Sequence, residues 1–133
     1  MSNKIIWLRI SCWAGAVVDG LSLVPMLFPN VARIMFGLPE LNASLEYLYA
    51  VRLGAALMLG WTCLLLWADQ KPLERKDILL LTMFPVLTGL IITELVTAAS
   101  GFLAIINLLP LLLLQTVLFG LFLFSYLNAI RKN

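Results

Sequence analysis

Four long apolar runs, separated by short polar segments, constrain the fold of this chain more than any other feature. They cover residues 5–27, 46–68, 78–99 and 103–128. A helix needs roughly 20 apolar residues to cross the hydrocarbon core of a bilayer, and each run reaches this length. Backbone amides in lipid must be paired within a helix or a closed barrel. The runs lack the alternating apolar and polar residues of barrel strands, so we predict four transmembrane helices.

The composition agrees with a chain that lies mostly in lipid. Of the 133 residues, 62% are hydrophobic and 12% are charged, whereas a soluble domain averages about 25% charged residues. A water-soluble fold of this length buries only about two-thirds of the surface that its chain exposes, so lipid must cover the remainder. We predict one domain over residues 1–133: an all-α, polytopic membrane protein with an antiparallel bundle of four transmembrane helices.

The segments between the runs contain signals for helix ends and helix breaks. The stretch "NVARIMFGLPEL" is too short to span a membrane and predicts a short interfacial helix in the first loop, with Asn30 as its N-cap and Gly37 as its C-cap. Ser44 is a candidate cap for the second span. Pro85 and Pro110 lie inside the third and fourth runs and predict local kinks there.

The cations predict how the chain is oriented in the membrane. They gather at the two chain ends and between the second and third runs, whereas Arg33 is alone in the first loop and the third loop has none. By the positive-inside rule, both termini and the segment "DQKPLERKD" face the cytoplasm. The net charge of +2 is too small to indicate nucleic acid as a partner. The cations on the predicted cytoplasmic side are Lys4, Arg9, Lys71, Arg75, Lys76, Arg131 and Lys132.

Several kinds of chemistry lack the residues that they need. The chain has no histidine, which argues against haem ligation, acid–base catalysis by imidazole and most transition-metal sites. Its two cysteines, Cys12 and Cys63, lack the C-x-x-C spacing of a redox pair. No glycine-rich phosphate loop is present. We therefore expect no catalytic residues, metal or cofactor, and favour a protein that is not an enzyme over a membrane enzyme that acts on lipid.

Three ionisable residues lie well inside the predicted spans: Asp19, Arg52 and Glu94. A charge at the bilayer centre costs about 2.5–3.5 kcal/mol on insertion scales, so each is expected to have a partner. Counted from the span ends at about 1.5 Å per residue, these three and Asn107 fall in the outer half of the bilayer. We predict a salt bridge in which both carboxylates neutralise Arg52, with room for a proton on one carboxylate. Two hydroxyl residues complete the predicted cluster: Ser22 and Thr97.

The predicted cluster allows more than one role. It could bind, or bind and transport, a small amphipathic or anionic ligand, with Arg52 meeting the anionic group. Alternatively, it could only lock the helices of a structural or interaction subunit, or Arg52 could extend alone to the outer interface. In the second case, small-residue faces such as Ala56-x-x-x-Gly60 would dock a second copy or a membrane partner. The sequence leaves the ligand and the oligomeric state open.

Two stretches carry a resemblance to a known family. "RLGAALMLGWTCLLLWAD" and "KPLERKDILLLTMFPVLTGL", in the second and third spans, resemble small bacterial integral membrane proteins of the DoxX-like kind. The resemblance implies four helices and a location in the bacterial inner membrane. Some DoxX-like proteins accompany quinone-linked oxidoreductases, but this sequence has no redox motif that would carry such a role.

Overall fold

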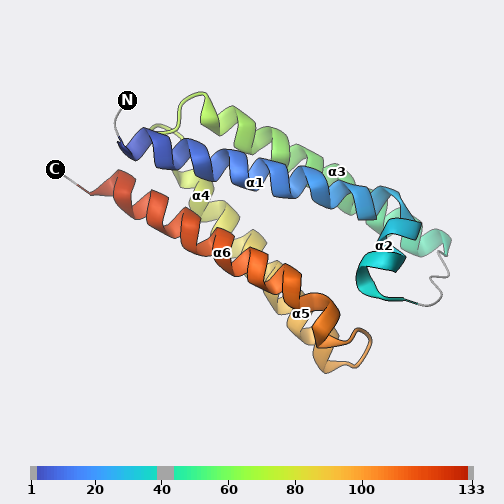
Figure 1. Cartoon of the computed structure of the whole chain (residues 1–133). Helices are drawn as coiled ribbons and strands as arrows, with labels where there is room; N and C mark the ends of the chain where they lie inside the picture. The colour runs from blue at the N-terminus through green and yellow to red at the C-terminus, as the bar shows by residue number, and fades with distance from the viewer. Residues whose placement is uncertain (1–2, 39–43, 132–133) are drawn as a thin grey trace.

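The structure, a computed structural model, describes residues 3–38 and 44–131. Every regular element of the described residues is a helix, and four helical spans are long and apolar enough to cross a membrane. This confirms the all-α class and the four long apolar helices, whose ends lie within two residues of the predicted ones. The elements in Figure 1 are α1 (Asn3–Leu27), α2 (Pro29–Phe36), α3 (Leu45–Asp69), α4 (Asp77–Leu81), the π-helix η1 (Thr82–Leu87), α5 (Thr88–Ala99) and α6 (Ile105–Ile130).

The helices associate as two pairs. Helix α1 packs most extensively against α3, while α6 packs against α4, η1 and α5. Contacts between α1 and α6 join the two pairs. Figure 1 shows that the pairs lie close together at the end that carries both termini and diverge toward the other end, where α2 lies. Helix α2 contacts both α1 and α6 there, so it links the pairs at their wide end.

The apolar core lies near the narrow end, where both termini are found. It includes Leu8 of α1, Met83 of η1 and Phe122 of α6, all with 0% exposure. Gly15 marks the closest approach of the helices, because a Cβ atom there would lie 2.9 Å from Leu65 Cδ1 and 2.9 Å from Phe122 Cζ. Glycine thus allows α1, α3 and α6 to meet at one level. Large apolar side chains cover much of the outside of the molecule, as expected where lipid is the solvent.

The predicted short helix of the first loop is present, but its first residue differs from the expected one. Asn30 does not cap α2: the N-cap is Phe28, and Pro29 is the first helical residue. Pro29 has a preset φ and no N–H to leave unpaired, so it starts the helix before Asn30 is reached. Gly37 is the C-cap with φ 65°, as predicted, since glycine adopts this left-handed conformation without strain. Ser44 caps α3 by accepting a backbone N–H at 3.2 Å, also as predicted.

The third span is not one regular helix. Six residues around Pro85 form the π-helix η1 between α4 and α5. Proline has no N–H for the α-helical bond, so the backbone pattern widens at this point. The Met83 carbonyl accepts the backbone N–H of Thr88 and also its hydroxyl, the latter at 3.0 Å. The regular α-helix is thus interrupted at Pro85, one of the two positions where a kink is predicted, and α6 is α-helical through the other, Pro110.

Candidate functional site

Arg52 lies far from the level of Asp19 along the α1–α3 pair. A Cβ atom at Gly20 would lie 4.0 Å from the Thr62 side chain, whereas one at Gly54 would lie 3.1 Å from Met26. Arg52 is therefore ten residues, or about 15 Å, further along α3 than the residue that faces Gly20. The Arg52 side chain is exposed, and within residues 3–38 and 44–131 it forms no ion pair.

Asp19 follows Gly15 by one helical turn, on the face of α1 that meets α3 and α6. The residue is partly buried, and its Oδ2 atom is enclosed without a hydrogen-bond partner among the described residues. Gly20 beside it faces the Thr62 side chain, so α3 packs closely at this level. The carboxylate thus points into the protein just beyond the apolar core, on the side where the helix pairs diverge.

Glu94 and Gln115 form a pair between α5 and α6. The amide Nε2 of Gln115 donates to Glu94 Oε1 at 2.6 Å. Gln115 is only 7% exposed, because it belongs to the buried stripe of α6 that continues to Leu118 and Phe122. Two acceptor atoms of the pair, Glu94 Oε2 and Gln115 Oε1, are buried and have no donor among the described residues.

We call Asp19, Glu94 and Gln115 the interior polar layer. Phe122 touches the position of Gly15, and from there Asp19 lies about 6 Å outward along α1 while Gln115 lies about 10 Å outward along α6. The two groups therefore differ in level along the helices by about 4 Å, and among the described residues no hydrogen bond joins Asp19 to the Glu94–Gln115 pair. Each of the three helices contributes one buried oxygen that lacks a donor. Such groups are costly where water is absent, so the layer is the least satisfied part of the interior.

The other predicted site residues are engaged elsewhere. Asn107 Nδ2 donates to the Phe36 carbonyl at 3.0 Å, which ties α6 to the end of α2. The Ser22 hydroxyl donates to the Val18 carbonyl at 2.8 Å, and the Thr97 hydroxyl donates to the Thr93 carbonyl at 2.7 Å. Both hydroxyls thus bond within their own helices. Of the six predicted residues, only Asp19 and Glu94 belong to the interior polar layer.

An apolar groove lies next to the Glu94–Gln115 pair. It has a volume of about 260 Å³ and runs between α5 and α6. Ile91 precedes Glu94 by one turn and Phe119 follows Gln115 by one turn, so the groove extends from the pair toward the narrow end of the molecule. The residues that line it are Thr88, Ile91, Ile92, Thr116 and Phe119. Neither Glu94 nor Gln115 lines the groove itself.

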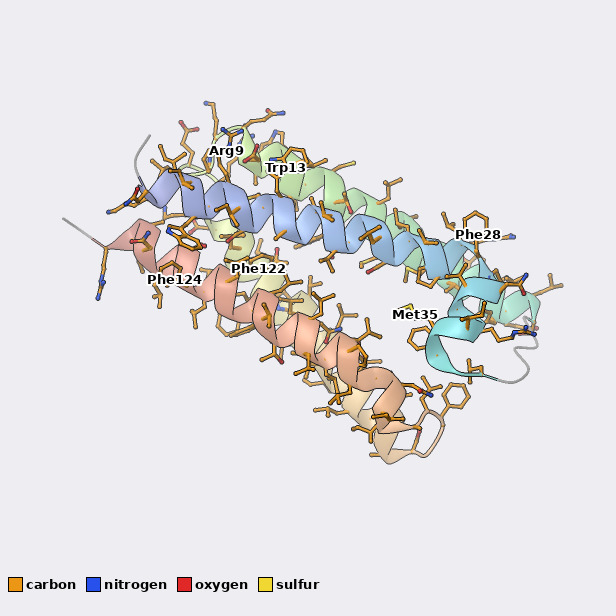
Figure 2. The ribbon with its side chains drawn as sticks, in the orientation of Figure 1. Arg9, Trp13, Phe28, Met35, Phe122 and Phe124 are labelled. Carbon is orange, nitrogen blue, oxygen red and sulfur yellow. The ribbon has the colours of Figure 1, made fainter. Side chains whose placement is uncertain are left out.

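The ion pair that joins α1 to α3 was missed by reasoning from the sequence. Arg9 Nε lies 2.9 Å from Asp69 Oδ1, and a second guanidinium nitrogen lies 3.1 Å from Oδ2. The indole N–H of Trp13 also donates to Asp69 Oδ2, at 3.1 Å. Asp69 is 9% exposed and both of its oxygens are satisfied. The available signal was that Arg9 and Trp13 share a helical face (Figure 2), at the same end of the molecule as Asp69.

Buried hydroxyls also join the helices near the termini. The Ser11 hydroxyl donates to the Ser125 hydroxyl at 2.7 Å, and Ser125 donates to the Trp7 carbonyl at 3.1 Å. Both serines are 0% exposed. This contact and the Arg9–Asp69 pair fix α1 against its two neighbours, and neither leaves a charged group unpaired. These buried polar groups at the narrow end therefore have hydrogen-bond partners, whereas the interior polar layer has buried acceptors without donors.

The cysteines are few and separate from the interior polar layer. Cys12 is buried and Cys63 is exposed, and both are free thiols. Within the described ranges, no group of three histidine, cysteine, aspartate or glutamate side chains is close enough to hold a metal ion.

The chain matches no protein-family model, no curated protein and no solved structure. Its likeness to DoxX-like proteins in the second and third spans stays a prediction.

Proposed function

We propose that this chain is a multi-pass protein of a bacterial inner membrane that binds a small amphipathic ligand at the interior polar layer. In this proposal its helices form an antiparallel bundle, with both termini in the cytoplasm. The observation that carries the proposal is the set of three buried acceptor atoms, one from each of three helices, without donors among the described residues. A ligand that completes their hydrogen bonds would remove a penalty that the protein otherwise bears.

A purely structural role explains the interior polar layer less well. A half-satisfied polar network is less favourable than an apolar core of the same shape. The same chain satisfies both oxygens of Asp69 with Arg9 and Trp13 where it fixes α1 to α3. By contrast, Glu94 is offered only the amide of Gln115. This contrast supports a role for the interior polar layer other than holding the helices together.

The adjacent groove supports an amphipathic ligand over a purely polar one. Its lining is mainly isoleucine and phenylalanine, and it begins one turn from Glu94 and Gln115. Ligand sites are mostly apolar with a few polar groups that orient the ligand. Arg52 is exposed and about 15 Å away, so in this proposal it does not hold the ligand.

Native mass spectrometry of the protein released from mild detergent tests the proposal. We expect wild type and Arg52→Ala to retain a bound mass and the double variant Glu94→Leu/Gln115→Leu to lose it. The double variant replaces both polar partners with apolar side chains, which is often neutral or stabilising, so it is expected to remain folded. Thr93→Val is the matched control, because the Thr93 hydroxyl donates only to the Gly89 carbonyl and Thr93 does not line the groove. A bare wild type, or a double variant that keeps the mass, would contradict the proposal.

A second candidate function is that of an interaction subunit. Ala56 and Gly60 are exposed on one side of α3, and a Cβ atom at Gly60 would meet nothing within 4 Å. Small residues at this spacing allow a second helix to approach closely. If this face docks another chain, Gly60→Leu should dissociate a dimer or a stoichiometric partner while the bound mass is unaffected. A monomer in both wild type and variant would exclude this role.

A further inference from the structure

We propose that the narrow end of the molecule binds an anionic phospholipid, in a groove along the last two turns of α6. This groove, which we call the terminal groove, has a volume of about 520 Å³. Ligand sites in proteins usually have volumes of about 300–1,000 Å³. The site is separate from the interior polar layer and goes beyond the function proposed for that layer. The residues that line the terminal groove are Phe124, Leu127, Asn128, Ile130 and Arg131.

The lining of the terminal groove changes from apolar to polar along α6. Phe124, Leu127 and Arg131 are spaced by three and four residues, so they share one face of the helix. Arg131 directly follows the last helical residue and lies about 10 Å further along the axis than Phe124. The half-buried amide of Asn128 lies between them in the sequence. The groove thus has an apolar wall at its deeper end and a guanidinium at its outer end.

Helix α1 places an aromatic ring and a second cation beside this groove. Phe124 lies at the narrow end of the molecule (Figure 2), and its ring centroid is 5.0 Å from that of Trp7 in an edge-to-face contact. Lys4 precedes Trp7 by one helical turn, so the two share a face of α1. Lys4 does not line the groove, but its ammonium donates to the Arg131 carbonyl. Two cations, one from each helix, therefore meet at the outer end of the groove.

The charges at the outer end select the head group. Among the described residues the ion pairs are those of Arg9 with Asp69 and of Lys71 with Glu74, so neither cation of the groove has a carboxylate partner there. A phosphate diester has the negative charge and the acceptor oxygens that guanidinium and ammonium groups bind. A zwitterionic head group would bring an ammonium of its own toward these cations. An anionic head group is therefore favoured.

The partial charges of the helix ends do not oppose an anion at this place. The C-terminal end of α6 carries a partial negative charge, and the N-terminal end of α1 carries a partial positive one. Both ends lie at the narrow end of the molecule (Figure 1), where the Lys4 ammonium contacts the Arg131 carbonyl. The two helix ends thus offset each other, and the two side-chain cations determine the sign of the local charge.

The order of apolar and charged groups indicates a lipid over a soluble anion. Tryptophan is enriched at the level of the lipid head groups, and long cationic side chains extend toward them. Basic pockets between transmembrane helices bind anionic head groups on the cytoplasmic side, where both termini are proposed to lie. A free phosphate would leave the apolar wall uncovered. A phospholipid would place its phosphate at Lys4 and Arg131 and an acyl chain along Phe124 and Leu127.

Native mass spectrometry with added lipid tests this proposal. Protein stripped of lipid in mild detergent is titrated with dioleoylphosphatidylglycerol or with dioleoylphosphatidylcholine, which has the same acyl chains. We expect the first phosphatidylglycerol molecule to bind at least about tenfold more tightly than phosphatidylcholine. Glycerol phosphate, which has no acyl chain, should not displace it at equal concentration. Equal affinities for the two lipids would overturn the proposal, and so would displacement by glycerol phosphate, because the site would then recognise a soluble anion.

Charge variants locate the preference in the terminal groove. In Lys4→Gln/Arg131→Gln the affinities for the two lipids should agree to within about threefold. Lys71→Gln/Lys76→Gln is the matched control, because it removes two cations from the loop between α3 and α4 at the same end of the molecule. This control should keep the preference, and an equal loss in both variants would mean that the overall charge of this end is responsible. Arg131→Gln alone keeps the backbone contact with Lys4, so it should reduce the preference without loosening the helix ends.

The position of the lipid is tested independently of the interior polar layer. Phosphatidylglycerol with a photoreactive diazirine in one acyl chain should form adducts within residues 124–131, as located by fragmentation of the labelled peptide. Adducts confined to other spans would contradict the proposal. The double variant Glu94→Leu/Gln115→Leu should bind phosphatidylglycerol as wild type does. The ligand of the interior polar layer and the lipid of the terminal groove can therefore be confirmed or excluded separately.

Discussion

At the scale of single residues, Gly15 provides the most direct test of the packing. A Cβ atom at Gly15 would lie 2.9 Å from Leu65 and from Phe122, and both side chains are 0% exposed, so neither can move away freely. We expect Gly15→Ala to lower the free energy of unfolding by about 1–3 kcal/mol, the usual effect of overpacking a core. Unfolding by sodium dodecyl sulfate in mixed micelles, followed by circular dichroism, measures this change.

Gly60→Ala is the matched control for this substitution. A Cβ atom there would meet nothing within 4 Å, and alanine favours a helix over glycine by up to about 1 kcal/mol. The control should therefore be neutral or slightly stabilising. Equal destabilisation by both substitutions would mean that α1, α3 and α6 do not meet at Gly15.

Reasoning from the sequence identified which residues are unusual more reliably than which residues meet. Asp19 and Glu94 were singled out because charges are rare in apolar spans, and both have a buried, unpartnered oxygen in the structure. Gln115 was not included in the predicted cluster, because an uncharged amide is less conspicuous than a charge. Arg52 was grouped with them by counting residues from the span ends. That count assumes that the spans start at a common plane.

The assumption fails because α3 extends past the end of α1. Gly54 faces Met26, which is the second-last residue of α1, yet α3 begins nine residues before Gly54 at Leu45. This overhang is about two and a half turns, and it carries Arg52 outward, away from Asp19. Helix register depends on where small side chains allow close approach, and these contacts involve residues far apart in the sequence. The relative depth of two spans therefore cannot be read from their ends.

At the scale of elements, the local rules predicted most helix ends. Gly37 and Ser44 act as caps as predicted, because a helix cap depends on the conformation and hydrogen bonds of the capping residue itself. Pro85 interrupts the third span for the same local reason. The start of α2 shows the limit of these rules. Both Pro29 and Asn30 favour a helix start, and the helix begins at Pro29, the earlier of the two. Residues 39–43 and Lys132, a cation used to predict the orientation, lie outside the described residues.

Helix α2 gives the prediction that belongs to this scale. Its end is tied to α6 by the hydrogen bond from Asn107 to the Phe36 carbonyl. Asn107→Leu removes this bond, whose net value of about 1 kcal/mol corresponds to about a fivefold increase in local opening. We expect trypsin to cleave after Arg33 about fivefold faster in the variant, in detergent micelles, as measured by mass spectrometry of the fragments.

Thr116→Val is the control for the cleavage measurement. The Thr116 side chain is exposed on α6 and bonds only to the carbonyl of its own helix, so cleavage after Arg33 should proceed at the wild-type rate. If Asn107→Leu also leaves the rate unchanged, α2 is not held to α6 by this contact, and it does not link the two helix pairs as described.

At the scale of the whole molecule, the charge distribution predicts the orientation in the membrane. Cysteine labelling in spheroplasts tests it, in a background with Cys12→Ala and Cys63→Ala. Ser100 follows α5 and Glu74 lies between α3 and α4, and both are exposed. We expect a membrane-impermeant maleimide to label Ser100→Cys from outside and Glu74→Cys only after lysis, since cationic loops stay in the cytoplasm. The reverse pattern would invert the proposed topology.

The whole molecule also combines two kinds of interior. The narrow end has an apolar core and satisfied polar contacts, such as those of Asp69 and Ser125. The polar layer beyond it has buried acceptors without donors. Stability near the termini and a binding function beyond the core would thus occupy different levels of the same four helices. Such a division is expected when an unsatisfied site is tolerated for its function.

Nuclear magnetic resonance of the glutamine side-chain amides would test the central claim most directly. The chain has two glutamines, Gln115 in the interior polar layer and Gln70 beside the exposed polar loop, so selective labelling gives a signal and its internal control. In nanodiscs, we predict that the Gln115 amide shows cross-peaks to protein and none to lipid acyl chains. Cross-peaks from the Gln115 amide to acyl chains would contradict the account.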